Sequence, residues 1–163
     1  MQKDSDFELF RDNYQRFLAE HVAPFYETWE EQGLIPRELW HKLGDNGFLC
    51  VDVPEEYGGF GAPIHYSQML VQETAKAGFT ALAVGIGGQS ELVSPYIQNI
   101  GSEEQKQYWL PKMVSGEVVT AIAMTEANAG SDLQAIRTQA ILDGDHYVVD
   151  GSKTFISNGH HAD

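Results

Sequence analysis

The feature that most constrains the fold is a change in the spacing of apolar residues near position 117. Between residue 7 and about residue 31, apolar side chains recur at steps of three and four, which is the stripe of an amphipathic helix. These side chains are Phe7, Phe10, Tyr14, Phe17, Leu18 and Val22. Residues 118–123 instead form an apolar run rich in β-branched side chains, as in a strand. The change predicts an N-terminal all-α helical bundle over residues 1–117, followed by an antiparallel β domain that starts at residue 118.

Proline and glycine residues predict where the helices of the N-terminal part break or end. Pro24 should kink or break the first helix, and Gly33 should end it. Ser102 and Gln105 have the spacing of a capping box, which predicts a helix start. The other expected elements are helices over residues 37–45, 64–77 and 81–98, a helix from 102 to about 108, another that Pro111 opens and that ends near Gly116, and an ordered loop over 48–63.

Three glycines fall inside the helix expected over residues 81–98, namely Gly85, Gly87 and Gly88. Each costs a helix up to about 1 kcal/mol. Their proximity indicates that the backbone approaches something closely, either a neighbouring helix or a ligand.

Strand candidates after residue 118 are short and separated by turn signals. They cover residues 139–142, 146–150 and 153–157. Asp143-Gly144 and Asp150-Gly151 are dipeptides that supply the positive φ of tight hairpin turns. A sheet of these strands alone would leave an edge and a face uncovered, so we expect the sequence to be part of a longer protein.

The charge balance excludes one class of partner. The chain has 24 acidic and 10 basic residues, a formal net charge of −14, and such a surface repels phosphate backbones, so nucleic-acid binding is not expected. Any phosphate ligand would have to be bound by local donors such as backbone N–H groups. No apolar run approaches the roughly 18 to 20 residues of a membrane helix. The N-terminus resembles neither a secretory signal nor a transit peptide, so a cytoplasmic location is the default and a processed organellar protein the alternative.

The residues that commonly bind metals do not form a site. Cys50 is the single cysteine, which excludes an internal disulfide and a cysteine-cluster metal site, and its apolar surroundings predict a buried, inert thiol. None of the six histidines pair at the i, i+4 spacing of a helical metal site. No metal is expected.

Residues 125–132, TEANAGSD, follow the apolar run of 118–123 closely. Small residues and Gly130 let backbone amides approach a ligand, while Thr125 and Ser131 add hydroxyl groups. The run is neither a GxGxxG fingerprint nor a Walker A loop. From the residues alone it is either a ligand-facing loop or a plain surface loop.

The longer run AMTEANAGSDLQA, residues 123–135, resembles the signature of the acyl-CoA dehydrogenase family position by position. Three other blocks resemble the same family in order and spacing. They are PEEYGGFG at residues 54–61, GSEEQKQYWLPKMVSGE at 101–117 and DGSKTFISNGHHAD at 150–163. The resemblance covers essentially the whole chain and is closest to the long-chain branch.

The resemblance implies a helical domain, a middle β-barrel domain and a second helical domain around FAD and an acyl-CoA thioester. A glutamate of the last domain removes the α-proton while the β-hydride goes to the flavin, giving a trans-2-enoyl-CoA; no catalytic residue is therefore expected within this sequence. By resemblance the cofactor-binding residues are Ile122, Met124, Thr125, Gly130, Ser131, Phe155, Ile156 and Ser157, and Ser131 also meets the substrate. The signature residue Glu126 is expected to position or pair charges and not to act as the base.

Two departures from the family pattern preserve its chemistry. Ala127-Asn128 stands where many relatives have Pro-Gly, and Asn tolerates the left-handed conformation. Phe155-Ile156-Ser157 stands where many have Trp-Ile-Thr, which keeps an aromatic face and a hydroxyl. By resemblance we expect medium to long acyl chains, an electron-transfer flavoprotein as acceptor, a homodimer or homotetramer, and a bacterial cytoplasmic or mitochondrial matrix location. Alternatives are an acyl-CoA oxidase or flavin monooxygenase of the same fold, or an inactive helical module without flavin.

Overall fold

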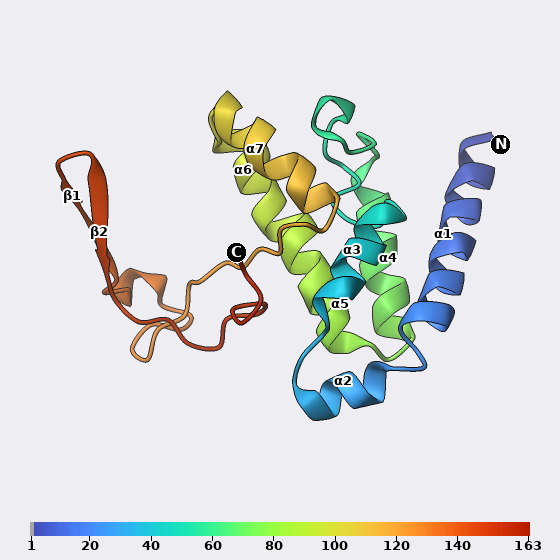
Figure 1. Ribbon diagram of the computed structural model, residues 1–163, viewed down its shortest axis with the longest axis horizontal. Coiled ribbons are helices and arrows are strands. Elements are labelled where there is room, and N and C mark those ends of the chain that lie inside the picture. Colours follow the sequence, from blue (N-terminus) through green and yellow to red (C-terminus); the bar gives the residue numbers. More distant parts are fainter. Residues whose placement is uncertain (1) are drawn as a thin grey trace.

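A computed structural model describes the backbone of residues 2–163 and the side chains of residues 5–163. Helices fill the first two thirds of the chain, and a β-hairpin projects from them on a long irregular segment (Figure 1). The helical elements are α1 (Gln2–His21), α2 (Tyr26–Gln32), α3 (Arg37–Asp45), the short 3₁₀ turn η1 (Glu55–Tyr57), α4 (Ile64–Lys76), α5 (Thr80–Gly87), the π-helix η2 (Gly88–Val93), α6 (Ser94–Ile100), α7 (Glu103–Val114) and, in the irregular segment, the 3₁₀ turn η3 (Leu133–Ala135). Within the described chain no helix is both long and apolar enough to cross a membrane.

The expected break at Pro24 is confirmed, because α1 ends at His21 and α2 begins at Tyr26. Gly33 ends α2 in the left-handed conformation, with φ of 68°, as the sequence predicts. The capping box at the start of α7 is also confirmed: the Ser102 hydroxyl accepts from the Gln105 amide, and the Gln105 side chain accepts from the Ser102 amide. Local side-chain chemistry therefore sets these helix ends.

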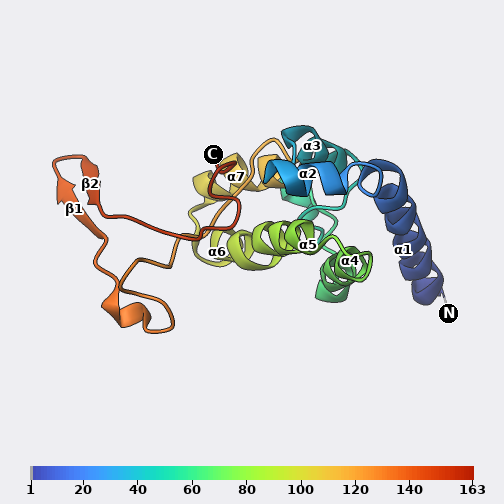
Figure 2. The same ribbon diagram turned by 90° about the horizontal axis from the view of Figure 1, so that it is seen from below.

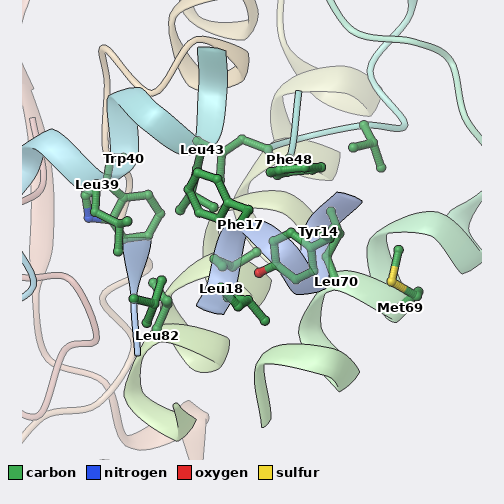
Figure 3. Packing of buried hydrophobic residues seen from close by; sticks show 14 of the residues in the cluster. Tyr14, Phe17, Leu18, Leu39, Trp40, Leu43, Phe48, Met69, Leu70 and Leu82 are labelled. Atoms are coloured by element: carbon green, nitrogen blue, oxygen red, sulfur yellow. The ribbon is translucent and has the colours of Figure 1, made fainter. Parts of the chain in front are cut away.

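Aromatic residues of α1 and the 48–63 loop form the centre of the main core (Figure 3). Tyr14 and Phe17 each pack edge-on against Phe48, with ring centroids 4.8 and 5.3 Å apart. The Tyr14 hydroxyl is hydrogen-bonded to Thr74 of α4, so its polar end is satisfied inside the core. Trp40 of α3 is fully buried. Each such side chain contributes roughly 1.5–3 kcal/mol on burial.

The prediction that Pro111 opens a new helix is wrong, because α7 runs unbroken from Glu103 to Val114. A proline inside a helix costs about 3 kcal/mol. Leu110, Met113 and Val114 are all buried in one apolar cluster with residues of the 48–63 loop, and their burial at roughly 1.5–3 kcal/mol each outweighs that cost.

The glycine-rich helix expected over residues 81–98 is divided into α5, the π-helix η2 and α6. Gly85 lies against other residues closely: a Cβ there would sit 3.2 Å from the Trp40 ring and from the Asn158 side-chain oxygen. Gly87 faces Val71 of α4, and a Cβ at Gly88 would meet nothing within 4 Å. Close packing therefore accounts for Gly85, whereas Gly88 leaves open space.

The π-helix turns two consecutive polar residues inward. Gln89 and Ser90 are fully buried. The Gln89 amide donates to the carbonyl oxygens of Met113 and Val118 at 2.9 and 3.2 Å, and its oxygen accepts from the Thr120 amide at 3.1 Å. The Ser90 hydroxyl accepts from the Cys50 amide at 3.0 Å. Through these hydrogen bonds the π-helix connects α7 to the irregular segment that begins at Val118.

The predicted hairpin is confirmed over β1 (Gln139–Asp143) and β2 (His146–Asp150), which pair antiparallel from Gln139↔Asp150 to Asp143↔His146. Gly144 supplies the positive φ of its turn, at 64°. Figure 2 shows the hairpin away from the helices in a second view. All ten of its residues are exposed.

The strands predicted at 118–123 and 153–157 do not form, and Asp150-Gly151 makes no hairpin turn. Both segments have irregular backbone. In the first, the side chains of Asn158 and Asp163 bond to the Thr120 carbonyl and the Val119 amide, which a ladder would use. Gly151 packs against Thr138, where a Cβ would lie 2.2 Å from the hydroxyl oxygen. Thr138 and Gly151 flank the Gln139↔Asp150 pair, so the two ends of the hairpin stay in contact beyond the ladder.

Replacement of Gln89 by Leu should destabilise the protein, because two carbonyl groups that bond the buried Gln89 side chain lose their donor and the part-buried Thr120 amide loses its acceptor. An unsatisfied buried group costs roughly 1–3 kcal/mol. Thermal melting of the full-length protein measures the effect. Gln107→Leu is the matched control, since Gln107 is exposed and bonds only Glu103; equal melting temperatures for the two variants would contradict the assignment.

Candidate functional site

Residues 119–125 and 154–163 lie beside each other in opposite directions, and we call them the two-segment wall. The Thr154 amide donates to the Thr125 carbonyl at 3.0 Å, and the Asp163 amide to the Val119 carbonyl at 3.1 Å. Between these points the Asn158 side chain donates to the Thr120 carbonyl at 3.2 Å. The wall therefore forms from two stretches about 35 residues apart in the chain. In the sequence they lie on either side of the β-hairpin.

Arg37, at the start of α3, fastens to the helices the end of the wall where Val119 and Asp163 meet. Its guanidinium donates to the carbonyl oxygens of Glu117 and His161 and pairs with the Asp163 carboxylate. Desolvation raises the pKa of Asp163, but the hydrogen bond from the Val119 amide and the Arg37 charge together bring it below its usual value. The carboxylate is thus held ionised at the junction.

A cavity of about 210 Å³ separates the wall from α5 and η2. We call it the junction cavity. The helices contribute Val84, Gly88 and Leu92. The wall contributes Thr120, Ala121, Ile122, Met124, Thr125, Phe155, Ile156, Ser157 and Asn158. The open space at Gly88 is therefore part of this cavity, which Val84 and Leu92 line with apolar side chains.

Six of the eight residues expected to bind a cofactor line the junction cavity: Ile122, Met124 and Thr125 from one segment and Phe155, Ile156 and Ser157 from the other. The remaining two, Gly130 and Ser131, lie outside it in an exposed loop. That loop begins with a tight bridge in which Glu126 and Ala129 exchange backbone hydrogen bonds. A Cβ at Gly130 would meet nothing within 4 Å, so its backbone is open to approach.

Phe155 has an unusual conformation. Its side chain is 94% exposed, although burying an aromatic ring is strongly favourable. Its φ is 55°, in the left-handed region that bulky residues rarely adopt. Strained backbone and an uncovered aromatic face are features of ligand sites.

Sequence reasoning missed the helical side of the cavity and one polar residue of the wall. The Thr120 hydroxyl is buried and has no partner in the described chain, although it lines the cavity. The glycine cluster signalled Gly88, but no pattern pointed to Thr120, Val84 or Leu92. A larger cavity of about 790 Å³ adjoins the same wall and shares four lining residues with the junction cavity: Val84, Ile156, Ser157 and Asn158.

Glu126 makes the densest set of polar contacts near the site. Its carboxylate accepts from the amides of Arg137 and Thr138 at 2.8 and 3.0 Å, from the Thr138 hydroxyl, and from the Lys153 ammonium at 2.8 Å. The bond from Lys153 is the largest influence, and together these donors lower the pKa of Glu126 to about 2. A carboxylate so fully paired is a poor proton acceptor, in agreement with the expected ion-pairing role.

Cys50 is fully buried, as predicted. Burial raises the pKa of its thiol to about 12, so the reactive thiolate is not formed near neutral pH.

A helical bundle joined to a β-hairpin segment, with a ligand cavity at the junction, is the class of structure that this chain defines. Comparison with known proteins makes the class specific. Residues 4–117 match the acyl-CoA dehydrogenase N-terminal domain, and residues 121–163 match the acyl-CoA dehydrogenase middle domain. The chain belongs to the acyl-CoA dehydrogenase family. The resemblance and the predicted fold class are confirmed.

Individual relatives cover nearly all of the chain. It is 41% identical over 155 residues to the mitochondrial long-chain specific acyl-CoA dehydrogenase of Sus scrofa, which is 95% of this chain and 36% of that protein. The crystal structure of an acyl-CoA dehydrogenase from Geobacillus kaustophilus superposes with a TM-score of 0.94 at 52% identity, over 97% of this chain and 41% of that one. An acyl-CoA dehydrogenase complexed with FAD from Bacillus anthracis gives 0.90 at 33% identity, over 98% and 27%. The chain thus spans well under half the length of these relatives.

Replacing Glu126 by Gln should make the stability of the protein depend less on pH between about 4.5 and 2. Because folding lowers the pKa of Glu126 from about 4.5 to about 2, the ionised carboxylate stabilises the protein above pH 4.5, and this stabilisation is lost as the pH falls toward 2. Urea unfolding midpoints of the wild type should therefore drop more steeply over this window than those of the variant. Parallel profiles would contradict the assigned network.

Proposed function

We propose that this sequence forms part of an enzyme that oxidises acyl-CoA thioesters to trans-2-enoyl-CoA with FAD, and that it supplies one wall of the flavin site. The observation that carries the proposal is the junction cavity, where Thr125 and Phe155–Ser157 face the helices from two distant stretches of chain. Identity of 41% to a long-chain specific enzyme supports medium to long acyl chains as substrates.

FAD is the cofactor of this family, and relatives of this chain have been solved with FAD or FADH2 bound. The residues present fit such a group. The unpartnered Thr120 hydroxyl, the hydroxyls of Thr125 and Ser157 and the uncovered ring of Phe155 supply polar edges and a flat apolar face. Gly130 exposes backbone that a phosphate could approach. When bound, FAD supplies the acceptor for the hydride from the substrate β-carbon.

The residues of this chain bind and orient; they do not move the α-proton. Thr125 and Ser157 would hold the polar edge of the ring, where a hydrogen bond stabilises developing negative charge. Phe155 would cover the ring face and exclude water. Ser131 and Gly130 would meet the pyrophosphate of FAD or the pantetheine arm of the substrate. Glu126 is fully engaged with its donors, so the base is proposed to lie in a further helical domain.

The wider assignment follows the family. We propose residues 1–117 as the N-terminal helical domain and 118–163 as the start of the middle β domain. The complete protein would form a homodimer or homotetramer and pass electrons to an electron-transfer flavoprotein. Its compartment would be the bacterial cytoplasm or the mitochondrial matrix.

Ser157→Ala in the full-length protein should slow reduction of the flavin by a long-chain acyl-CoA about tenfold or more, because a hydrogen bond to developing charge is lost. Anaerobic stopped-flow absorbance of the flavin measures the rate. Ser152→Ala is the matched control, since Ser152 is exposed and does not line the cavity. Unchanged reduction in both variants would remove Ser157 from the site.

Turnover by the full-length protein should require an electron-transfer flavoprotein, and the 163-residue chain alone should show no turnover because it lacks the proposed base. Acyl-CoA oxidation is assayed in air with and without that acceptor. Rapid peroxide formation without it would indicate an oxidase. Absence of flavin absorbance from the purified full-length protein would indicate a module without FAD.

A further inference from the structure

Three stretches of chain around the wall converge on one carboxylate. Glu126 directly follows Thr125, which lines the junction cavity. Its partners come from Arg137 and Thr138, 11 and 12 residues later, and from Lys153, which lies two residues before Phe155. The β1–β2 ladder, which ends at Gln139↔Asp150, brings the second and third stretches near each other. The first stretch lies outside that ladder and is joined to the others by the Thr154–Thr125 backbone hydrogen bond and by side chains.

Lys153 joins both segments of the wall. Its ammonium group lies 2.8 Å from the Glu126 carboxylate and donates to the Met124 carbonyl at 3.0 Å. The next residue, Thr154, donates its amide to Thr125. The ion pair is largely shielded from water, with the Lys153 side chain 20% exposed and that of Glu126 8% exposed. Screening by solvent is therefore weaker than for a surface pair.

The same carboxylate closes the loop that carries Gly130 and Ser131. Because Glu126 accepts from both Arg137 and Thr138, the loop is fastened at its base, while Gly130 and Ser131 stay exposed. The backbone of Gly151 packs directly on Thr138, and a Cβ at this position would overlap the Thr138 hydroxyl. A larger residue at position 151 would therefore push the two stretches apart. One anion thus sets the distance between the loop and the wall.

We propose that Glu126 and Lys153 are positioning residues for the flavin: their ion pair holds Thr125, the 130–131 backbone and Phe155–Ser157 in the arrangement that binds the cofactor. This inference rests on the proposed function. On this inference Glu126 positions the residues that bind the flavin, and it needs Lys153 as its ion-pair partner to do so. Loss of either charge would leave the other partly buried and unpaired, and would loosen the Thr125 end of the wall, where the Thr154–Thr125 backbone hydrogen bond would remain.

The test is FAD binding by the full-length apoprotein, followed by flavin fluorescence, for Lys153→Met, Lys153→Arg and Glu126→Gln. Lys153→Met should raise the FAD dissociation constant about tenfold or more and alter the shape of the bound flavin absorbance bands. Lys153→Arg should restore most of the affinity, because its guanidinium can reach both acceptors. Lys76→Met is the matched control: Lys76 pairs with Glu73 at the same 2.8 Å, on α4 and outside both described cavities.

Affinity and absorbance of Lys153→Met and Glu126→Gln within twofold of the wild type would overturn the inference and leave the proposed function standing. An equal loss of affinity in Lys76→Met would also overturn it, because removing an ion pair far from the site would then weaken FAD binding just as much. If Lys153→Met does not fold, Glu126→Gln decides, because it keeps the shape of the side chain and removes only its charge. A wild-type protein that takes up no FAD would refute the proposed function, and the inference with it.

Discussion

The side-chain amide of Gln89 connects the two parts of this structure. It is buried where the π-helix widens the backbone, and it bonds at once to the end of α7, to Val118 and to Thr120. Those last two residues begin the segment that forms the first half of the wall. A regular helix would carry Gln89 and Ser90 on successive faces about 100° apart. The wider turn places both inside, so the irregularity in the helix determines where the wall starts.

Two basic side chains fix opposite ends of the wall. The chain has ten basic residues against 24 acidic ones; of the ten, Arg37 joins Glu117 to His161 and Asp163, and Lys153 bonds Met124 and Glu126. Each combines an ion pair with donation to backbone carbonyls, which gives direction as well as attraction. The wall thus needs no β-ladder of its own, and its backbone can take the left-handed conformations of Phe155 and Asn158.

Local rules predicted the parts of the fold that local chemistry decides. The capping box at Ser102, the break at Pro24 and the Asp143-Gly144 hairpin depend on residues a few positions apart. The errors share a different cause. Pro111 is tolerated because distant residues bury the helix around it, and residues 118–123 form no strand because side chains from far along the chain take their backbone groups. Likewise, six of eight predicted site residues meet at one cavity, whereas Thr120, Val84 and Leu92 carried no signal in the sequence.

We propose above that two distant stretches of this sequence, 119–125 and 154–163, together form one wall of a flavin site. A crystal structure of the full-length protein with FAD would show this wall directly. We expect the flavin ring against Phe155–Ser157 with its polar edge at Thr125, and Lys153 still bonded to Glu126. A flavin bound away from both stretches, or a wall whose two segments have separated, would contradict it.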